Sequence, residues 1–379
     1  MLLTAETLLT GRELLRPGWI DVSDGTVVAV GAGTAPRPAD RDLGAVTVVP
    51  GFVDTHVHGG AGANFSTASA AETSTAVAIH RTHGTTTLVA SLVTASPDEL
   101  LRQVTGLAPD VHAGLLAGIH LEGPWLSAKR CGAHQPALMR NPDPAEIDRV
   151  LDAGQGTIRM VTLAPERDGA LAAIERIVDD GVVAAAGHTE ATYAQTRGAI
   201  AAGATVGTHL FNAMRPINTR EPGPVIALLE DPRVTVELIT DGVHVDPALY
   251  RHVAHSVGPD RVSLITDAMA ATGKADGVYH LGPIQVDVVD GVARVAGTAT
   301  IAGSTATMDR VFRFAVAHCG LPRDEGLLLA ARQASINPAR ALGLPCEGLV
   351  AGAAADLVVL DSELAVTAVL HRGAWEEMP

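Results

Sequence analysis

The sequence predicts an α/β protein: a (β/α)8 barrel of the TIM type, with a small β-sandwich domain formed from both termini. Three observations indicate this fold. The central part of the 379-residue chain alternates apolar strand-like runs with alanine-rich helical stretches eight times. Histidine or a carboxylate follows most of these runs, and both ends of the chain instead carry short β-type segments. Regular alternation of strands and helices is the pattern of a parallel barrel.

The two termini have the same texture and are expected to pair with each other. Asp24 and Gly25 form a hairpin turn between two of the short apolar segments near the N-terminus. We therefore expect a small domain from residues 1–48 plus 345–379, and a barrel from residues 49–344. The expected terminal strands cover residues 19–22, 26–30, 356–360 and 366–370.

The central segments are assigned in order along the chain. The eight strands are expected to end near His58, Thr94, Glu122, Pro165, His188, His209, His244 and Asp267. Helices are expected over residues 70–83, 97–107, 144–153, 170–180 and 193–202. A doubly wound open sheet would accept a similar alternation, but no glycine-rich dinucleotide loop follows the early strands. Residues 278–295 predict a hairpin insertion with Asp290 and Gly291 at its tip.

Composition limits the classes of partner. The formal net charge of −15 argues against a nucleic-acid or anionic-membrane surface, so an anionic substrate would need a locally basic site. Three scattered cysteines do not make a disulfide framework. The start of the chain has no secretion-signal pattern, and no apolar run is long enough to span a bilayer. We expect a cytoplasmic protein.

The most informative segment is the apolar run that ends in His56 and His58. Side chains alternate along a strand, so these two imidazoles point the same way and can hold one divalent metal. Other strand ends carry similar groups, and in a barrel these ends meet at one mouth. Alone, each histidine is more often structural and each carboxylate more often a helix cap. Together they predict a metal centre, whose expected ligands are His56, His58, Glu122, His188, His209 and Asp267.

The residues around these positions resemble the amidohydrolase superfamily and, within it, the family of N-acetylglucosamine-6-phosphate deacetylases. The runs His-Leu-Glu-Gly-Pro-Trp at 120–125 and Thr-His-Leu-Phe-Asn-Ala-Met at 208–214 are specific to these deacetylases, and further matches lie at 50–58, 187–189, 240–244 and 266–269. The resemblance extends to about Leu349. It implies hydrolysis of N-acetyl-D-glucosamine 6-phosphate to D-glucosamine 6-phosphate and acetate, in amino-sugar recycling and cell-wall precursor metabolism.

The resemblance also implies how the metals are held. Many amidohydrolases bridge two ions with a carboxylated lysine, but neither Lys129 nor Lys274 lies at a strand end. Glu122 is then the implied bridge. Because both His56 and His58 are present, we expect two divalent ions per subunit, with zinc first and iron, cobalt or manganese as alternatives.

The expected mechanism uses a metal-bound hydroxide, because a metal lowers the pKa of its water from 15.7 towards about 7. This hydroxide attacks the acetamide carbonyl while a metal and His134 stabilise the oxyanion. Asp267 takes the proton of the water and passes it to the departing amine. His134 and Asp267 are thus the expected catalytic residues.

Substrate contacts are carried over from matching motifs. Arg220 is expected to reach the 6-phosphate in the neighbouring subunit of a homodimer, because a guanidinium binds phosphate bidentately. Taken alone, Arg220 would be an ordinary solvated loop arginine. The expected substrate-binding residues are Ala133, His134, Asn212, Ala213, Arg220, Asp241, His244, Ile301, Ala302 and Gly303.

The sequence allows more than one role for two residues near the predicted site. Cys131 could ligate a metal when its loop closes, act as a redox-sensitive thiol, or be a plain loop cysteine, which we favour. His120 shares the Glu122 face of its strand and could support the metal ligands. Eight other histidines are given no function: His80, His83, His112, His252, His255, His280, His318 and His371.

Two alternative functions remain at this stage. Another amidohydrolase, such as a cyclic amidase or a dipeptidase, usually has the lysine bridge and lacks the His-Leu-Glu-Gly-Pro-Trp run. A non-catalytic scaffold of the same fold typically loses metal ligands, whereas every expected ligand is present here.

Overall fold

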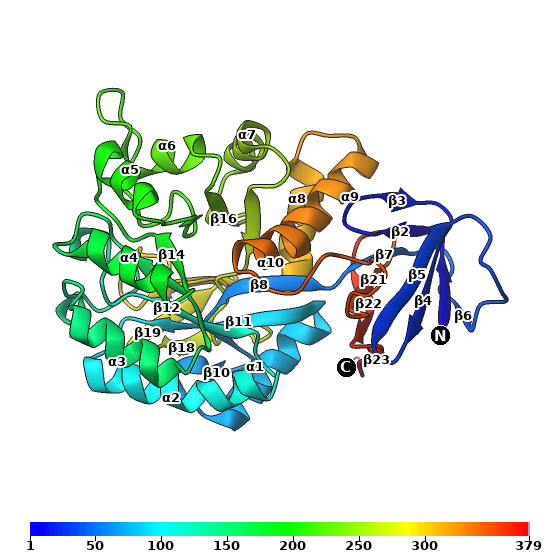
Figure 1. Cartoon of the computed structure of the whole chain (residues 1–379), viewed down its shortest axis with the longest axis horizontal. Helices are drawn as coiled ribbons and strands as arrows, with labels where there is room; N and C mark the ends of the chain where they lie inside the picture. Colours follow the sequence, from blue (N-terminus) through cyan, green and yellow to red (C-terminus); the bar gives the residue numbers. More distant parts are fainter. Residues whose placement is uncertain (378–379) are drawn as a thin grey trace.

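The computed structural model describes residues 1–377 and contains a barrel with a smaller β unit at one end (Figure 1). Eight parallel strands form the barrel in the order β17-β16-β15-β14-β13-β12-β11-β8, so neighbours in sequence are neighbours in space. This is the predicted barrel and not a doubly wound sheet. The strands are β8 (Phe52–Val57), β11 (Thr85–Val93), β12 (Gly118–Glu122), β13 (Ile158–Leu163), β14 (Val183–Ala186), β15 (Val206–Gly207), β16 (Thr235–Ile239) and β17 (Val262–Ile265).

The first and last strands close the barrel at the end where the metal ligands were predicted. The backbone N–H of Asp267 donates to the carbonyl of His56 at 2.9 Å, and that of His58 donates to the carbonyl of Ala268 at 2.8 Å. Lower in the barrel, Oγ1 of Thr266 donates to Oδ2 of the buried Asp54 at 2.5 Å. These bonds fix Asp267 next to the two histidines of β8.

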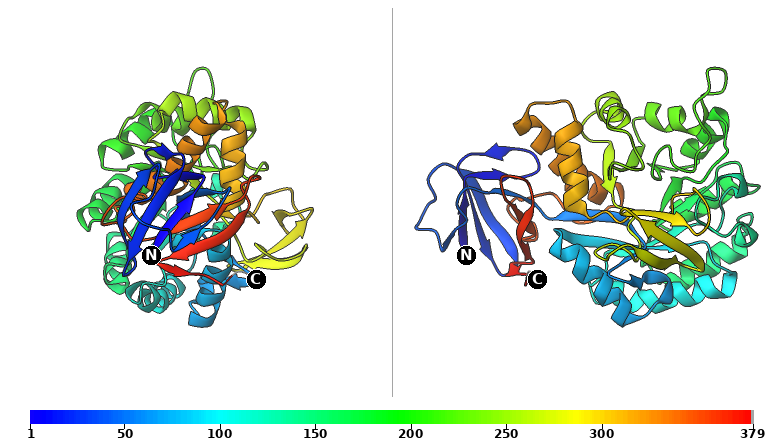
Figure 2. Two further views of the ribbon diagram at one scale, coloured as in Figure 1. Left: turned by 90° about the vertical axis from the view of Figure 1, so that its right-hand side faces the viewer. Right: turned by 180° about the vertical axis from the view of Figure 1, so that it is seen from behind.

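Helices cover the outside of the barrel (Figure 2). Several begin with the expected capping chemistry: Ser96 and Asp143 accept hydrogen bonds from backbone N–H groups three residues on, and proline follows each. The helix predicted to stop at residue 107 continues through Pro109, because its buried face includes Leu107 and Ala108. The helices are α1 (Ala70–Thr82), α2 (Pro97–His112), α3 (Pro144–Gly154), α4 (Ala170–Asp179), α5 (Tyr193–Ala201), α6 (Gly223–Glu230), α7 (Pro247–Val257), α8 (Met308–His318), α9 (Arg323–Ala331) and α10 (Asn337–Ala341), with the π-helical segment η4 (Arg332–Ile336) before the last.

Seven of the eight strand ends lie within two residues of the predicted positions. The seventh strand is the exception. It ends at Ile239, and His244 lies in the loop beyond it, so the predicted end near His244 was wrong. Asp241 ends the strand locally, because its Oδ1 accepts hydrogen bonds from the backbone N–H groups of Val243 and His244 at 2.8 and 2.9 Å. Such a turn stops strand pairing.

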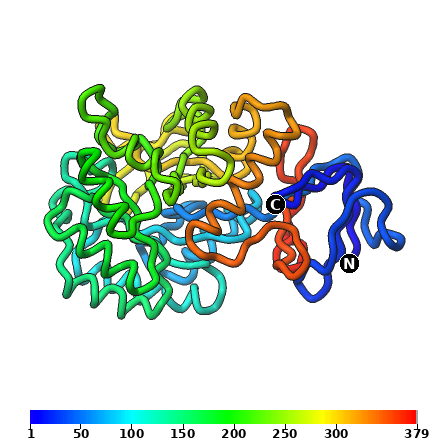
Figure 3. The backbone as a smooth tube through the Cα atoms, turned by 45° about the horizontal axis from the view of Figure 1, so that its top comes forward, coloured from blue at the N-terminus to red at the C-terminus, as the bar shows by residue number. Residues whose placement is uncertain are grey.

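The small β unit consists of two sheets whose strands come from both termini. One sheet has the order β5-β4-β1-β6, and the other has the order β23-β22-β21-β7-β2-β3. Leu3, Ile20 and Leu357 are fully or almost fully buried in its core, and the blue N-terminal and red C-terminal segments lie together at this end of the molecule (Figure 3). The strands are β1 (Leu2–Ala5), β2 (Thr7–Leu9), β3 (Leu14–Leu15), β4 (Gly18–Ser23), β5 (Thr26–Ala32), β6 (Arg41–Asp42), β7 (Thr47–Pro50), β21 (Leu357–Leu360), β22 (Val366–His371) and β23 (Ala374–Trp375).

The border between the two units remains a proposal. We place the small domain at residues 1–48 plus 345–379. Strand β7 crosses the first of these borders, because Val48 and Val49 both pair with β21. The chain therefore enters the barrel directly from a strand of the small domain.

An insertion follows the last barrel strand, as the sequence predicts, but it has three strands and not two. Strands β18 (Gly277–Leu281), β19 (Ile284–Val289) and β20 (Val292–Val295) form an antiparallel sheet, with Asp290 and Gly291 in the second turn. This sheet stands out from the side of the barrel, in yellow in the left view of Figure 2. The short elements β9 (Gly59–Gly60), β10 (Ala63–Asn64), η1 (Phe65–Thr67), η2 (Ala128–Arg130) and η3 (Pro136–Leu138) lie in the loops.

Among the described residues, none of the helices combines the length and apolar character needed to cross a membrane.

Candidate active site

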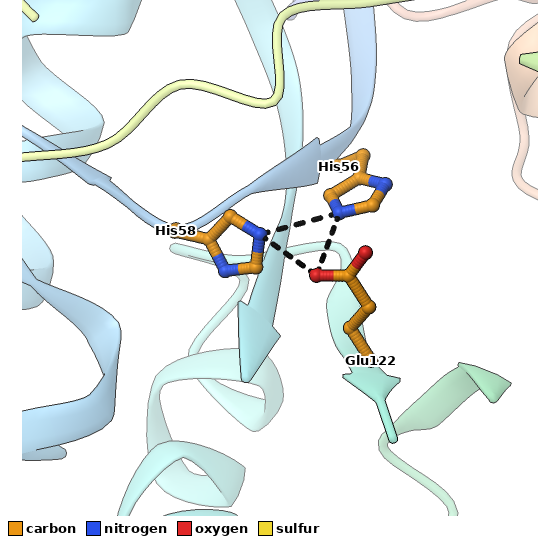
Figure 4. A group of neighbouring side chains, drawn as sticks. All are labelled: His56, His58 and Glu122. Carbon is orange, nitrogen blue, oxygen red and sulfur yellow. Dashed lines mark hydrogen bonds and ion pairs between the residues drawn. The ribbon is translucent and has the colours of Figure 1, made fainter. Parts of the chain in front are cut away.

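Two strands bring His56, His58 and Glu122 together in the barrel (Figure 4). His56 lies on β8, His58 directly follows that strand, and Glu122 ends β12. The two Nε2 atoms are 3.3 Å apart, and they lie 3.4 and 3.2 Å from Oε2 of Glu122. All three side chains are at most 3% exposed. The alternation of the strand thus produces the shared orientation that the sequence predicted.

These separations fit one divalent ion. Ligand atoms about 2.0–2.1 Å from a tetrahedral ion lie about 3.3 Å from one another. The three atoms in Figure 4 form a triangle with sides close to that length. A metal centre therefore fits the donor set and its spacing.

A second pair of histidines faces the other oxygen of the same carboxylate. Nε2 of His188 and Nε2 of His209 lie 3.0 and 2.8 Å from Oε1 of Glu122. These two nitrogen atoms are 3.1 Å apart. Glu122 thus presents one oxygen to His56 and His58 and the other to His188 and His209.

Asp267 completes the cluster from the end of β17. Its Oδ1 is 3.1 Å from Nε2 of His58 and 3.6 Å from Nε2 of His56. The side chain also borders the open pocket. Asp267 is therefore in contact both with the metal-competent histidines and with the space available to a substrate.

Hydrogen-bond partners assign the ring protons of three of these histidines. In each, Nδ1 faces an acceptor, so in the neutral ring Nδ1 carries the proton and Nε2 keeps a free lone pair directed at the cluster. This is the tautomer that a metal ligand requires. The acceptors are Oε2 of Glu237 for His56 (3.4 Å), the carbonyl of Ser91 for His58 (3.2 Å) and the carbonyl of Arg130 for His188 (2.8 Å).

His134 has the opposite arrangement. Its Nδ1 accepts a hydrogen bond from the backbone N–H of Thr94 at 3.2 Å, and Oγ1 of Thr94 lies 3.0 Å from the same atom. A backbone N–H can only donate, so the proton of neutral His134 must be on Nε2, which points toward Glu122 at 3.3 Å. His134, although close enough to be counted with Glu122 and His188, is set up as a hydrogen-bond donor and not as a metal ligand.

Without a bound metal, the histidines and carboxylates of the cluster shift one another's pKa values. Burial opposes the charged form of His58, but Asp267 and Glu122 outweigh it and raise its pKa to about 9. Burial also opposes ionisation of Asp267, yet the neighbouring histidines lower its pKa to about 2. Burial lowers the pKa of His134 to about 4, so this ring is neutral. The cluster holds dense negative charge that protons or metal ions must balance.

The backbone is strained where the site is built. His188, His209 and Asp267 have φ angles of +46°, +26° and +50°. A non-glycine residue in this region costs of order 1–3 kcal/mol and persists where the surroundings enforce it. Gly303 has a φ of +62°, and a Cβ there would lie 2.9 Å from the carbonyl oxygen of Asp267. The barrel mouth therefore depends on a glycine beside Asp267.

A pocket of about 390 Å³ opens over the cluster. Its wall includes residues of the insertion as well as residues of the barrel loops. Most of the expected substrate-binding residues are part of this wall. The lining comprises His58, Glu122, Lys129, Arg130, Gly132, Ala133, His134, His188, His209, Asn212, Ala213, His244, Asp267, Leu281, Ala299, Thr300, Ile301 and Gly303.

Four expected residues are not part of this wall. His56 is fully buried beneath it. Asp241 instead holds His244, with Oδ2 at 2.8 Å from Nδ1 of that ring. Ala302 is fully buried between two lining residues. Arg220 is exposed, in the loop before α6, and does not line the pocket of its own chain.

A hydrogen bond and an ion pair hold the loop before His134 against the cluster. The carbonyl of Arg130 accepts from Nδ1 of His188, and the guanidinium of Arg130 pairs with Glu190. Gly132 lies against the ring of His188, where a Cβ would come within 3.0 Å of Cε1. Cys131 is partly buried and has a free thiol, and it is not among the described residues whose ligand atoms converge.

Three residues near the site were not singled out from the sequence. Glu237 contacts His56, Thr94 fixes the ring of His134, and Lys129 lines the pocket. Thr94 was noted only as a strand end, and Lys129 was considered only as a bridge. His120, which was considered as a supporting residue, packs on His56 with ring centroids 4.5 Å apart. Its two nitrogens bond Ser91 and Thr162 at 2.9 and 2.8 Å, so it is held rigidly under the cluster.

The barrel carries paired histidines and buried carboxylates that are compatible with a divalent metal site, and comparison with known proteins identifies the class as a hydrolase. The chain matches the amidohydrolase family over residues 47–376 and belongs to it.

Individual relatives are more specific. The chain is 36% identical over 382 residues to N-acetylgalactosamine-6-phosphate deacetylase of Escherichia coli O157:H7, a match that covers 97% of this chain and 98% of that protein. It is 34% identical over 377 residues to N-acetylglucosamine-6-phosphate deacetylase of Vibrio furnissii, covering 97% and 93%. A solved structure is similar with a TM-score of 0.98 and 74% identity, covering 99% of this chain and 98% of that one. It is the D267A mutant of N-acetyl-D-glucosamine-6-phosphate deacetylase from Mycobacterium smegmatis, in complex with N-acetyl-D-glucosamine-6-phosphate.

Proposed function

We propose that this protein hydrolyses the acetamide of N-acetyl-D-glucosamine 6-phosphate, giving D-glucosamine 6-phosphate and acetate. The observation that carries the proposal is the split contact of Glu122, whose two oxygens face two separate histidine pairs beside Asp267. The comparisons add the substrate class, because the relatives are deacetylases of phosphorylated N-acetyl amino sugars. None of the relatives named above is a cyclic amidase or a dipeptidase, which favours the deacetylase over these two alternatives. A non-catalytic scaffold would not need the intact ligand set.

We propose two divalent ions per subunit, with zinc as the first candidate and iron, cobalt or manganese as alternatives. His56 and His58 would hold one ion, His188 and His209 the other, and Glu122 and Asp267 would contribute carboxylate oxygens. When bound, such ions acidify a water molecule and polarise a carbonyl oxygen.

The residues of the chain then have distinct tasks. Asp267 accepts the proton of the attacking water at its carboxylate and delivers it to the nitrogen of the leaving amine. His134 donates from Nε2 to the acetamide oxygen as negative charge develops there. A preorganised donor of this kind is worth about 10²–10³ in kcat. Thr94 keeps that proton on Nε2, so the donor is ready before the substrate binds.

The phosphate needs cations at the mouth of an acidic protein. Within one chain, Lys129 and Arg130 line the pocket, and Arg130 is already paired with Glu190. Lys129 is therefore the cation of this chain that remains for the phosphate. We further propose a homodimer in which Arg220 reaches the pocket of its neighbour, which is consistent with its exposed position in the loop before α6. Ala133, Asn212, Ala213, His244, Ile301, Ala302 and Gly303 would shape the sugar site, with Asp241 holding His244.

N-acetyl-D-galactosamine 6-phosphate is a second candidate substrate, because one relative is named an N-acetylgalactosamine-6-phosphate deacetylase. We propose N-acetyl-D-glucosamine 6-phosphate as the preferred sugar. We place the reaction in the cytoplasm, where its product would feed amino-sugar recycling and cell-wall precursor synthesis. In this scheme Cys131 has no chemical role.

The experiment is an acetate-release assay with purified protein. N-acetylglucosamine 6-phosphate, N-acetylgalactosamine 6-phosphate and unphosphorylated N-acetylglucosamine are compared by kcat/KM. We expect the first sugar to give the highest value and the unphosphorylated sugar the lowest. Equal values for phosphorylated and free sugars would overturn the proposed substrate class.

A further inference from the structure

Glu237 is a buried carboxylate beneath the active site with no role in the scheme above. It lies in the middle of β16 and is 2% exposed. Unlike Glu122 and Asp267, it does not border the pocket. It therefore cannot touch a substrate, and its contacts must explain why a carboxylate is buried there.

Those contacts join the two histidine pairs. Oε2 of Glu237 lies 3.4 Å from Nδ1 of His56, and the same oxygen accepts from the backbone N–H of His209 at 3.4 Å. The other oxygen, Oε1, accepts from Oγ1 of Thr55 at 3.2 Å. One carboxylate thus holds the ring of His56 and the strand end that carries His209.

The basic side chain in contact with Glu237 is a histidine and not an arginine or a lysine. Within residues 1–377, its ion-pair partner is the imidazole of His56, and neither arginine nor lysine pairs with it. Burying a carboxylate without a compensating positive charge is strongly unfavourable. Positive charge on the far side of the His56 ring would supply that compensation.

We propose that Glu237 is a positioning residue for the metal subsite of His56 and His58. It holds the proton of His56 on Nδ1, turns the Nε2 lone pair toward Glu122, and adds a buried carboxylate next to the cluster. The inference rests on the proposed function, because it assumes that this cluster binds divalent ions. Supporting carboxylates of this kind typically change metal affinity by about 10–100-fold.

The test measures metal content and affinity directly, without relying on activity. Wild-type protein and the variants Glu237→Leu and Glu237→Gln are stripped with a chelator, then titrated with zinc against a chromogenic chelator. We expect two equivalents in the wild type. In Glu237→Leu, one equivalent should bind about 10–100-fold more weakly while the other changes little. Glu237→Gln keeps an acceptor oxygen, so its affinity for this equivalent should lie between those of the wild type and Glu237→Leu.

Controls keep the outcomes distinct. Glu230→Gln alters an exposed carboxylate on α6 and should bind zinc like the wild type. If Glu237→Leu does not fold, Glu237→Gln decides the question. Two equivalents at wild-type affinity in the folded variants would overturn the role of Glu237. A wild-type protein that binds no zinc would instead overturn the proposed function on which the inference rests.

Discussion

The ring of His134 receives a hydrogen bond from the backbone N–H of Thr94 at 3.2 Å, and this contact separates it chemically from the other histidines of the site. His56, His58 and His188 meet acceptors at Nδ1, whereas His134 meets a donor. In their neutral forms, these four imidazoles therefore divide into three with free Nε2 lone pairs and one with an Nε2 proton.

This division predicts two different consequences of mutation. Removing the His134 donor with His134→Ala should lower kcat by about 10²–10³ and leave the metal content unchanged. His188→Ala should lower the metal content itself, because it deletes a ligand. Elemental analysis of both purified variants checks this. Loss of metal from His134→Ala would show that His134 is a metal ligand and not only a hydrogen-bond donor.

Asp267 is predicted to move protons in addition to contacting the ions. Asp267→Asn keeps the size and an oxygen ligand but cannot accept a proton. We expect the folded variant to retain its metal and to lose turnover by orders of magnitude. Steady-state kinetics with matched metal analysis is the measurement. A kcat close to that of the wild type would remove Asp267 from this role.

Phosphate recognition is predicted to depend on cations of two chains. A charge-assisted hydrogen bond is worth about 1.5–3 kcal/mol, so Arg220→Ala should raise KM for the phosphorylated sugar about 10–150-fold. Lys129→Ala should raise it less, because an ammonium cannot bind phosphate bidentately as a guanidinium does. The exposed Arg233→Ala is the control. Neither site variant should change KM for the unphosphorylated sugar, and an equal rise for both sugars would contradict phosphate contact.

The metal-free protein should lose stability as the pH rises from 6.5 to 9. His58 has a folded-state pKa of about 9, above its ordinary value of 6.5. A raised pKa means that the stabilising contribution is complete below pH 6.5 and disappears as the pH passes about 9. Urea unfolding of the chelator-treated protein at both pH values measures this. Greater stability at pH 9 would show that the carboxylates do not hold His58 in its charged form.

The sequence was sufficient to predict the barrel, because strand–helix alternation and polar strand ends are local patterns. It placed His56 and His58 on one face because strand geometry fixes that relation. It was insufficient for Glu237, whose partner His56 is 181 residues away along the chain. Nor could it predict the positive φ angles of His188 and His209, which are imposed by the assembled barrel mouth. The predicted strand end near His244 was also wrong, because the turn at Asp241 depends on a side-chain contact. The roles of the site residues remain predictions.

The most direct measurement is acetate release from N-acetylglucosamine 6-phosphate before chelation, after chelation and after zinc is restored. We expect activity to vanish when the metal is removed and to return with about two equivalents of zinc per subunit. Full activity in protein shown by elemental analysis to be free of divalent metal would contradict the convergence of both histidine pairs on a metal centre at Glu122.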